Sequence, residues 1–166
     1  MRAAARVLAV LAVAWAAATS AAEMRVFGPG SLESIRRAHA GRPFVLSFWS
    51  VHCEPCAREM AVWREMQARH PDVKVVLVAT DGPEEADRVE AFLRRHDPGP
   101  AERWRYADAF VEKIRYAIDP KWRGELPRTY FHDGEHRVEA VSGLPDPKWL
   151  EAWFVSAAGA ARKTPR

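Results

Sequence analysis

Two cysteines, Cys53 and Cys56, are the only ones in this chain, and they follow directly after an apolar run. Residues 44–49 read Phe-Val-Leu-Ser-Phe-Trp, a nearly continuous apolar segment typical of a strand buried on both faces. Behind the cysteines, the apolar side chains of residues 60–67 recur at helical spacing. The sequence therefore predicts a buried strand that leads into a Cys-x-x-Cys pair at the start of a helix.

This placement predicts redox chemistry at the pair. Unpaired backbone N–H groups and the positive end of the helix dipole would stabilise a Cys53 thiolate and lower the pKa of its thiol. The two-residue spacing puts Cys56 one helical turn further on, close enough to form a disulfide with Cys53. Pro55 falls at an early helical position, where its missing N–H costs little. We therefore expect Cys53 to be the exposed attacking sulfur and Cys56 the sheltered resolving sulfur in thiol–disulfide exchange.

Other interpretations of the pair remain open. A purely structural disulfide is one, although a bridge across so short a loop constrains the unfolded chain little. A Cu(I) or other metal–thiol carrier is another, and three histidines are available as further ligands: His52, His132 and His136. A redox-inactive binding module is a third. Attachment of c-type haem is excluded, because Ala57 rather than histidine follows Cys56.

The rest of the chain alternates short apolar runs with amphipathic stretches, which indicates an α/β domain. Further helices are expected over 31–40, 83–96, 110–118 and from 147 onward, and further strands over 73–79, 104–106, 129–131 and 138–141. Ser31 is the expected cap of the first helix. Asp133-Gly134 predicts a tight hairpin turn. We expect one domain over residues 23–158, followed by a frayed tail over 159–166.

The first 22 residues have the pattern of a secretory signal peptide. Arg2 and Arg6 precede an apolar run over residues 7–18, and small residues follow it up to Ala22, near which we expect cleavage. The run is shorter than the about 20 residues that a membrane span needs. An uncleaved membrane anchor remains the alternative. In both cases the folded domain is expected in the periplasm or another extracytoplasmic, disulfide-permissive compartment.

The charge balance argues against a nucleic-acid partner. The whole chain has a formal net charge of +3, but without residues 1–22 there remain 23 basic and 22 acidic side chains. A domain so close to neutrality lacks the basic excess that drives binding to nucleic acids. We expect protein partners, with no resident cofactor and no metal.

The tetrapeptide from Cys53 to Cys56 resembles the active-site motif of the thioredoxin-like family, in particular its exported TlpA/ResA-type thiol–disulfide oxidoreductases. Trp49, four residues before the first cysteine, matches a family position, and Leu126-Pro127 resembles the family's cis-proline segment. The resemblance spans roughly residues 25–155. It implies a thioredoxin-like α/β fold, a central mixed β-sheet flanked by helices, with an inserted helix before the cis-Pro hairpin.

The same resemblance implies the site residues. The catalytic residues would be Cys53, Cys56, Glu59 and Pro127. The residues of the substrate groove would be Trp49, His52, Glu54, Pro55, Leu126 and Arg128. A cis bond before Pro127 would hold the backbone of Leu126 opposite Cys53, where an extended substrate can pair as an added strand.

Three positions depart from the family pattern. Ser47 stands where thioredoxins carry a buried aspartate that handles the proton of the resolving thiol. Glu59 matches an acidic residue of the ResA-like branch and is expected to take over that role, which requires burial and a raised pKa; a solvated helix charge is the alternative. His52 replaces an aromatic residue, and is either a cation that favours the thiolate or a surface side chain. Arg128 replaces a threonine, and either selects acidic or polar substrate segments or is a solvated charge.

By resemblance, the function is reduction of disulfides in exported proteins, such as apocytochrome c or copper-centre assembly proteins. Electrons would come from a membrane donor of the DsbD/CcdA type, and a monomer is expected. The direction of electron flow depends on the reduction potential, which varies widely among proteins with this motif. The carboxylate of Glu54 beside the thiolate disfavours a very low pKa at Cys53, which favours a reductant.

Overall fold

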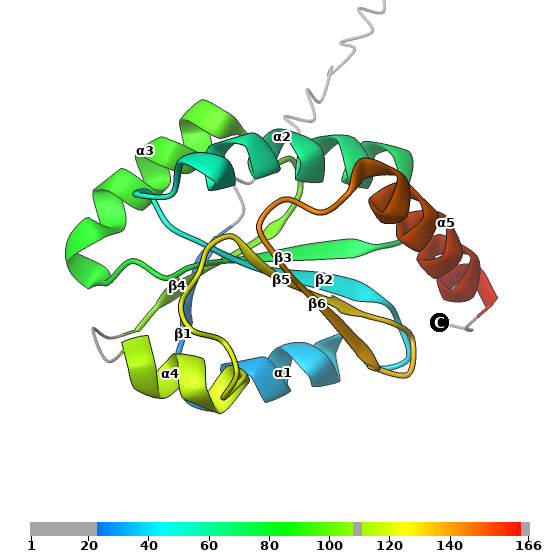
Figure 1. The fold of residues 1–166 in the computed structure, drawn as a ribbon, viewed down its shortest axis with the longest axis horizontal. Helices are drawn as coiled ribbons and strands as arrows, with labels where there is room; N and C mark the ends of the chain where they lie inside the picture. Colours follow the sequence, from blue (N-terminus) through cyan, green and yellow to red (C-terminus); the bar gives the residue numbers. More distant parts are fainter. Residues whose placement is uncertain (1–22, 108–110, 164–166) are drawn as a thin grey trace, which may run out of the picture.

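A computed structural model describes residues 23–107 and 111–163, which form one six-stranded sheet with helices on both faces (Figure 1). The strands are β1 (Met24–Phe27), β2 (Phe44–Trp49), β3 (Lys74–Ala79), β4 (Glu102–Tyr106), β5 (Arg128–His132) and β6 (Val138–Ser142). The helices are α1 (Ser31–Ala38), α2 (Glu54–Arg69), the short 3-10 helix η1 (Pro83–Glu85), α3 (Ala86–His96), α4 (Val111–Ile118) and α5 (Pro147–Lys163).

The sheet is mixed, with the strand order β1-β4-β3-β2-β5-β6. The first four strands in this order run parallel, whereas β5 is antiparallel to β2 and β6 is antiparallel to β5. Helices α1 and α4 cover one face, and α2, α3 and α5 cover the other (Figure 1). The expected mixed sheet flanked by helices is thereby confirmed.

Two apolar clusters fill the space between the sheet and its helices. The cluster on the α2 side contains Cys56, Trp63 and Phe131, and the cluster on the α1 side contains Phe44 and Phe48. All six residues of β2 are buried, because the strand lies between β3 and β5 and is covered on both faces. The end of this central strand is thus held firmly where the cysteine motif begins.

The N-terminal strand was not expected from the sequence. In β1 only Phe27 is buried, so the strand lacks the continuous apolar run that marked β2. It pairs in parallel with β4 at one edge of the sheet, where little of it needs to be apolar. The helix after it begins at Ser31, with Gly30 as its cap at φ 83°. The expected capping role of Ser31 is therefore wrong; its hydroxyl instead accepts a hydrogen bond from the Gly28 N–H at 3.0 Å.

The C-terminal helix is longer than expected. It continues to Lys163, so the frayed tail predicted from residue 159 is wrong over its first five residues. Ala157 and Ala158 are buried in the α2-side cluster, and this packing carries the helix past the predicted domain end.

The hairpin between β5 and β6 also differs from the expected tight turn. Its loop covers residues 133–137, and the left-handed backbone falls on His136 (φ 58°) rather than on Gly134. The Asp133 carboxylate accepts hydrogen bonds from the N–H groups of Glu135 and Arg137, and these bonds stabilise the wider loop.

The expected signal peptide, residues 1–22, lies outside the described residues. Within the part of the chain that the structure describes, no helix has the length and apolar character needed to cross a membrane.

Candidate active site

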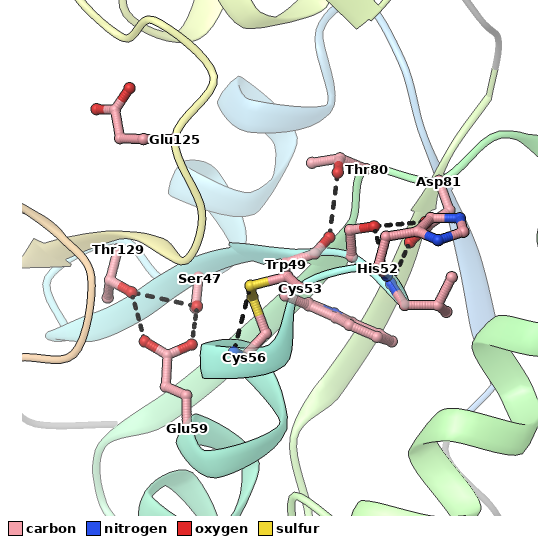
Figure 2. The surroundings of a disulfide bond; sticks show 12 residues. Ser47, Trp49, His52, Cys53, Cys56, Glu59, Thr80, Asp81, Glu125 and Thr129 are labelled. Carbon is pink, nitrogen blue, oxygen red and sulfur yellow. Dashed lines mark hydrogen bonds between the residues drawn. A yellow bond between two sulfur atoms is a disulfide. The ribbon is translucent and has the colours of Figure 1, made fainter.

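The two cysteines form a disulfide at the N-terminus of α2 (Figure 2). Cys53 is the cap residue, with an extended backbone, and its sulfur accepts a hydrogen bond from the Cys56 N–H at 3.2 Å. Cys53 is partly exposed, whereas Cys56 is fully buried. Pro55 lies in the first helical turn, as expected. This geometry gives a partner access to one sulfur and shields the other.

A buried carboxylate holds the loop that precedes Cys53. Asp81, just beyond the end of β3 and 7% exposed, accepts hydrogen bonds from the Ser50 hydroxyl at 2.7 Å and the Val51 N–H at 3.1 Å (Figure 2). The Ser50 hydroxyl in turn accepts the N–H of His52, and the Ser50 carbonyl accepts the N–H of Cys53. Each backbone N–H from Val51 to Cys53 therefore has a partner within this cluster, which holds the backbone that carries the Cys53 sulfur.

Sequence reasoning missed this role of Asp81. The available signal was a carboxylate placed directly after a buried parallel strand, at the edge of the sheet where β2 also ends. Its partners lie 30 and 31 residues earlier in the chain, so they emerge only when β2 and β3 are paired.

Trp49 does not form part of a substrate groove surface, contrary to expectation. Its side chain is fully buried and stacks on Phe92 of α3, with ring centroids 4.7 Å apart. The Trp49 carbonyl accepts both the N–H and the hydroxyl of Thr80. The residue thus packs beneath the site and ties the end of β2 to the end of β3.

Glu59 lies one helical turn after Cys56, on the buried side of α2. Its side chain is 0% exposed, so the alternative of a solvated helix charge is wrong. Removal from water raises the pKa of Glu59 to about 7, although hydrogen bonds from neighbouring side chains oppose the shift. A carboxyl group with this pKa can take up and release a proton near neutral pH.

The hydrogen bonds to Glu59 come from two strands. The Ser47 hydroxyl of β2 lies 2.9 Å from Oε2, and the Thr129 hydroxyl of β5 lies 3.1 Å from Oε1 (Figure 2). Ser47 and Thr129 are directly opposed in the β2–β5 register, and both are fully buried. Sequence reasoning identified Ser47 as a departure but missed Thr129. No local signal singled out Thr129, because β5 also contains the polar residues Arg128, Tyr130 and His132.

The proline segment leads directly into this cluster. The Leu126–Pro127 peptide bond is cis, and Pro127 is buried. Leu126 is partly exposed and packs against both apolar clusters. Since Thr129 contacts Glu59, which lies one turn from Cys56 on α2, the segment belongs to the same end of the sheet as the disulfide.

Arg128 is neither a solvated charge nor free to bind a substrate. Its side chain is only 14% exposed, and its guanidinium donates to Asp119 at 2.8 Å and to the Ser142 hydroxyl at 2.8 Å. Asp119 also accepts the hydroxyl of Tyr130. The alternative of a solvated charge is therefore wrong, and substrate selection by Arg128 stays a prediction that its bound guanidinium does not support.

His52 and Glu54 form the exposed rim beside Cys53. The His52 ring is 59% exposed, and its Nε2 lies 3.6 Å from the Glu85 carboxylate, so the ring leans toward the start of α3 rather than inward. Glu54 is 86% exposed and pairs with Arg58 one turn on in the same helix. These two side chains remain available to a partner that approaches the sulfur.

The histidines considered as metal ligands are not all brought to the cysteines. His132 and His136 pack against Phe44, in the cluster on the α1 side of the sheet, whereas Cys56 lies in the other cluster. Among residues 23–107 and 111–163, no group of three or more His, Cys, Asp or Glu side chains has the arrangement of a metal site.

Comparisons with known proteins agree with the predicted resemblance. The thiol-disulfide oxidoreductase ResA of Bacillus cereus is 30% identical over 115 residues, which are 69% of this chain and 62% of that protein. This chain thus spans less than two thirds of the length of this curated relative. No protein-family model matches the chain.

Solved structures show the fold. A secreted Mycobacterium tuberculosis disulfide oxidoreductase homologous to Escherichia coli DsbE superposes with a TM-score of 0.57 at 18% identity, covering 72% of this chain and 85% of that one. A thiol:disulfide interchange protein of the thioredoxin family from Chlorobium tepidum superposes with a TM-score of 0.60 at 14% identity, covering 75% and 85%. The predicted thioredoxin-like fold and the resemblance to ResA-type proteins are confirmed.

Proposed function

Since this chain is a thioredoxin-like protein similar to ResA-type thiol–disulfide oxidoreductases, we propose that it reduces disulfides in other proteins through the Cys53–Cys56 dithiol. One observation carries the proposal: a partly exposed cysteine caps a helix and is bonded to a fully buried cysteine within the same turn. A structural crosslink does not need this asymmetry, whereas an exchange reaction depends on it.

The reaction begins with the reduced protein. The Cys53 thiolate attacks one sulfur of a substrate disulfide, forms a mixed disulfide, and releases the other substrate sulfur as a thiolate that takes a proton. Cys56 then loses its proton and attacks the Cys53 sulfur, which releases the second substrate sulfur. Two electrons and two protons pass to the substrate, and the protein is left with the disulfide seen in the structure.

Glu59 supports the second step as the acceptor of the Cys56 proton. It follows Cys56 by three residues on α2 and has a pKa of about 7, so the carboxylate form is available at neutral pH. The proton can then pass to the departing substrate thiolate. Glu59 thereby takes the role that an aspartate at the position of Ser47 has in thioredoxins.

The substrates we propose are disulfides of exported proteins, in the periplasm or an equivalent compartment, with apocytochrome c and copper-centre assembly proteins as the leading classes. Electrons would return to Cys53–Cys56 from a membrane donor of the DsbD/CcdA type. The similarity to ResA and the N-terminal sequence pattern support this placement. The exposed carboxylate of Glu54 beside the reactive sulfur favours a reductant.

Insulin reduction by the pre-reduced protein tests the proposal, with the variants Cys53→Ser and Cys56→Ser. Wild type should precipitate the insulin B chain, C53S should be inactive, and C56S should accumulate a covalent mixed disulfide that dithiothreitol releases. The reduction potential should lie nearer the about −270 mV of thioredoxin than the about −120 mV of DsbA.

An anaerobic Cu(I) titration belongs beside this assay. Stoichiometric copper binding that requires both cysteines, without insulin reduction, would show that the chain is a copper carrier and not a reductase. Full activity of C53S would equally contradict the proposed mechanism.

A further inference from the structure

Three buried oxygen-bearing side chains form a closed triangle beside the disulfide (Figure 2). The Ser47 hydroxyl is 2.9 Å from Glu59 Oε2, the Thr129 hydroxyl is 3.1 Å from Glu59 Oε1, and the two hydroxyls are 3.2 Å apart. All three side chains are 0% exposed. With no exposed surface, these groups depend on contacts within the protein, and the Trp63 side chain of α2 also favours the ionised form of Glu59.

The triangle can hold either protonation state of Glu59. With Glu59 ionised, each hydroxyl donates to one carboxylate oxygen, and both oxygens have a donor. With Glu59 protonated, the acid donates to Thr129, Thr129 donates to Ser47, and Ser47 donates to the other carboxyl oxygen. Every group then donates once and accepts once.

The contact between the two hydroxyls explains why both strands contribute. In the ionised state this contact carries no hydrogen, but in the protonated state it closes the ring. Passing from one state to the other requires only rotation of the Thr129 hydroxyl, because Ser47 donates to Glu59 Oε2 in both states; no carbon, nitrogen or oxygen atom has to move. An unpaired buried polar group, which would destabilise the fold, is avoided in both states.

We propose that Ser47 and Thr129 are positioning residues that let the buried Glu59 take up and release one proton in place, and that they set the pH at which it does so. The inference rests on the proposed function only in assigning that proton to Cys56. The proton-holding triangle itself follows from the three contacts, whatever reaction the disulfide performs.

Infrared titration of the protonated carboxyl band tests the triangle without any activity assay. Glu59→Gln identifies the band by removing it. The test variants are Ser47→Ala, Thr129→Val and the double variant, and Thr129→Ser is the matched control that keeps the hydroxyl. Thermal unfolding of each variant shows which ones fold, and the single variants suffice if the double variant does not.

The wild-type band should titrate with a midpoint near pH 7. The double variant should move the midpoint upward by at least about one pH unit, because an ionised carboxylate depends on its donors more than a neutral acid does. Each single variant should give a smaller upward shift, and T129S should match wild type. An unchanged midpoint in the hydroxyl-free variants, or equal shifts in T129S and T129V, would overturn the inference.

The second readout separates this inference from the proposed function. In the insulin assay, the rate should depend on pH in wild type, S47A and T129V. The midpoint of this dependence should be higher in the two variants than in wild type, by the same amount as the infrared midpoint. If the midpoint shifts while every protein is inactive toward insulin, the triangle stands and the proposed function fails. If wild type reduces insulin but the midpoint does not respond to the hydroxyls, the function stands and the triangle fails.

Discussion

Asp81 and Ser50 lie 31 residues apart in the chain, yet a 2.7 Å hydrogen bond joins the carboxylate of one to the hydroxyl of the other. This bond connects the end of β3 to the loop after β2, and the second carboxylate oxygen binds the N–H of Val51. The position of the Cys53 backbone therefore depends on a residue from a neighbouring strand.

Replacing Asp81 with alanine should lower both stability and reductase rate. The Ser50 hydroxyl and the Val51 N–H would lose their acceptor in a largely buried place, which costs about 1–3 kcal/mol for each unsatisfied group. Urea unfolding measures the first effect and insulin reduction measures the second. Asp72→Ala is the control, since its ion pair with Arg162 is exposed and should contribute less than about 1 kcal/mol. Equal losses in both variants would argue against a holding role for Asp81.

The contribution of buried Glu59 to the stability of the protein should fall as the pH rises. Its pKa is about 7 in the folded state and close to 4.5 when unfolded, so the folded state binds the extra proton between these values. Stability from this group is thus fully present below about pH 4.5 and is lost by about pH 7. A shift of this size corresponds to about 3 kcal/mol. Urea unfolding from pH 4 to 9 gives the free energy of unfolding of wild type and of Glu59→Gln. The difference between the two should fall by this amount as the pH rises, and a constant difference would contradict the raised pKa.

The contribution of His132 to stability should change with pH in the opposite direction. It is buried and stacks on Phe44, and burial, reinforced by the cation of Arg36, lowers the pKa of its imidazole from 6.5 to about 4. The unfolded state therefore binds the extra proton between these values, and stability increases as the pH rises from about 4 to 6.5. The expected gain is about 3 kcal/mol relative to His132→Gln.

Over the shared pH range the pH-dependent contributions of Glu59 and His132 to the free energy of unfolding nearly cancel. The stability of Glu59→Gln should therefore rise with pH, because His132 remains, and that of His132→Gln should fall, because Glu59 remains. Above about pH 7 the difference between wild type and H132Q should become constant. A difference that keeps changing there would show that another group causes the slope.

Two arginine–aspartate ion pairs with similar N–O distances should contribute very differently to the stability of the protein. Arg128 lies 2.8 Å from Asp119 with both side chains mostly buried, whereas Arg137 lies 2.7 Å from Asp133 and is 76% exposed. Arg128→Ala leaves the Asp119 carboxylate without its cationic partner and should lower stability clearly more than Arg137→Ala, which removes a pair screened by water. Chemical unfolding compares them directly, and similar losses would contradict the assignment.

The same Arg128 variant distinguishes a structural role from substrate selection. Because its guanidinium is bound to Asp119 and Ser142, R128A should not weaken the reaction with acidic substrate peptides more than that with neutral ones. A selective loss toward acidic peptides would restore the original prediction.

Local patterns predicted the parts of the fold that are determined by neighbouring residues. The apolar run of β2 and the helical spacing behind Cys56 were sufficient to place the disulfide at the start of a helix. The strand β1 escaped prediction because it is short and mostly exposed at a sheet edge. The last turns of α5 were missed because Ala157 and Ala158 gain their burial from tertiary packing.

The polar contacts of the site were harder to predict, because they join residues that the register brings together. Thr129 meets Ser47 across 82 residues of sequence, and no local pattern marks that partnership. Arg128 was misread for the same reason, since its neighbours in the sequence do not reveal that its charge is neutralised within the chain.

In the exchange reaction proposed above, the burial of Cys56 has a consequence for the lifetime of the covalent complex with a partner. The second sulfur is three residues from the first and is held at a fixed place in the same helix, so its attack is unimolecular. Its rate depends on local geometry and proton transfer, and not on how much partner is present. An abundant partner and a scarce one would then remain attached for similar times, and competition between them would be decided entirely at first encounter with Cys53.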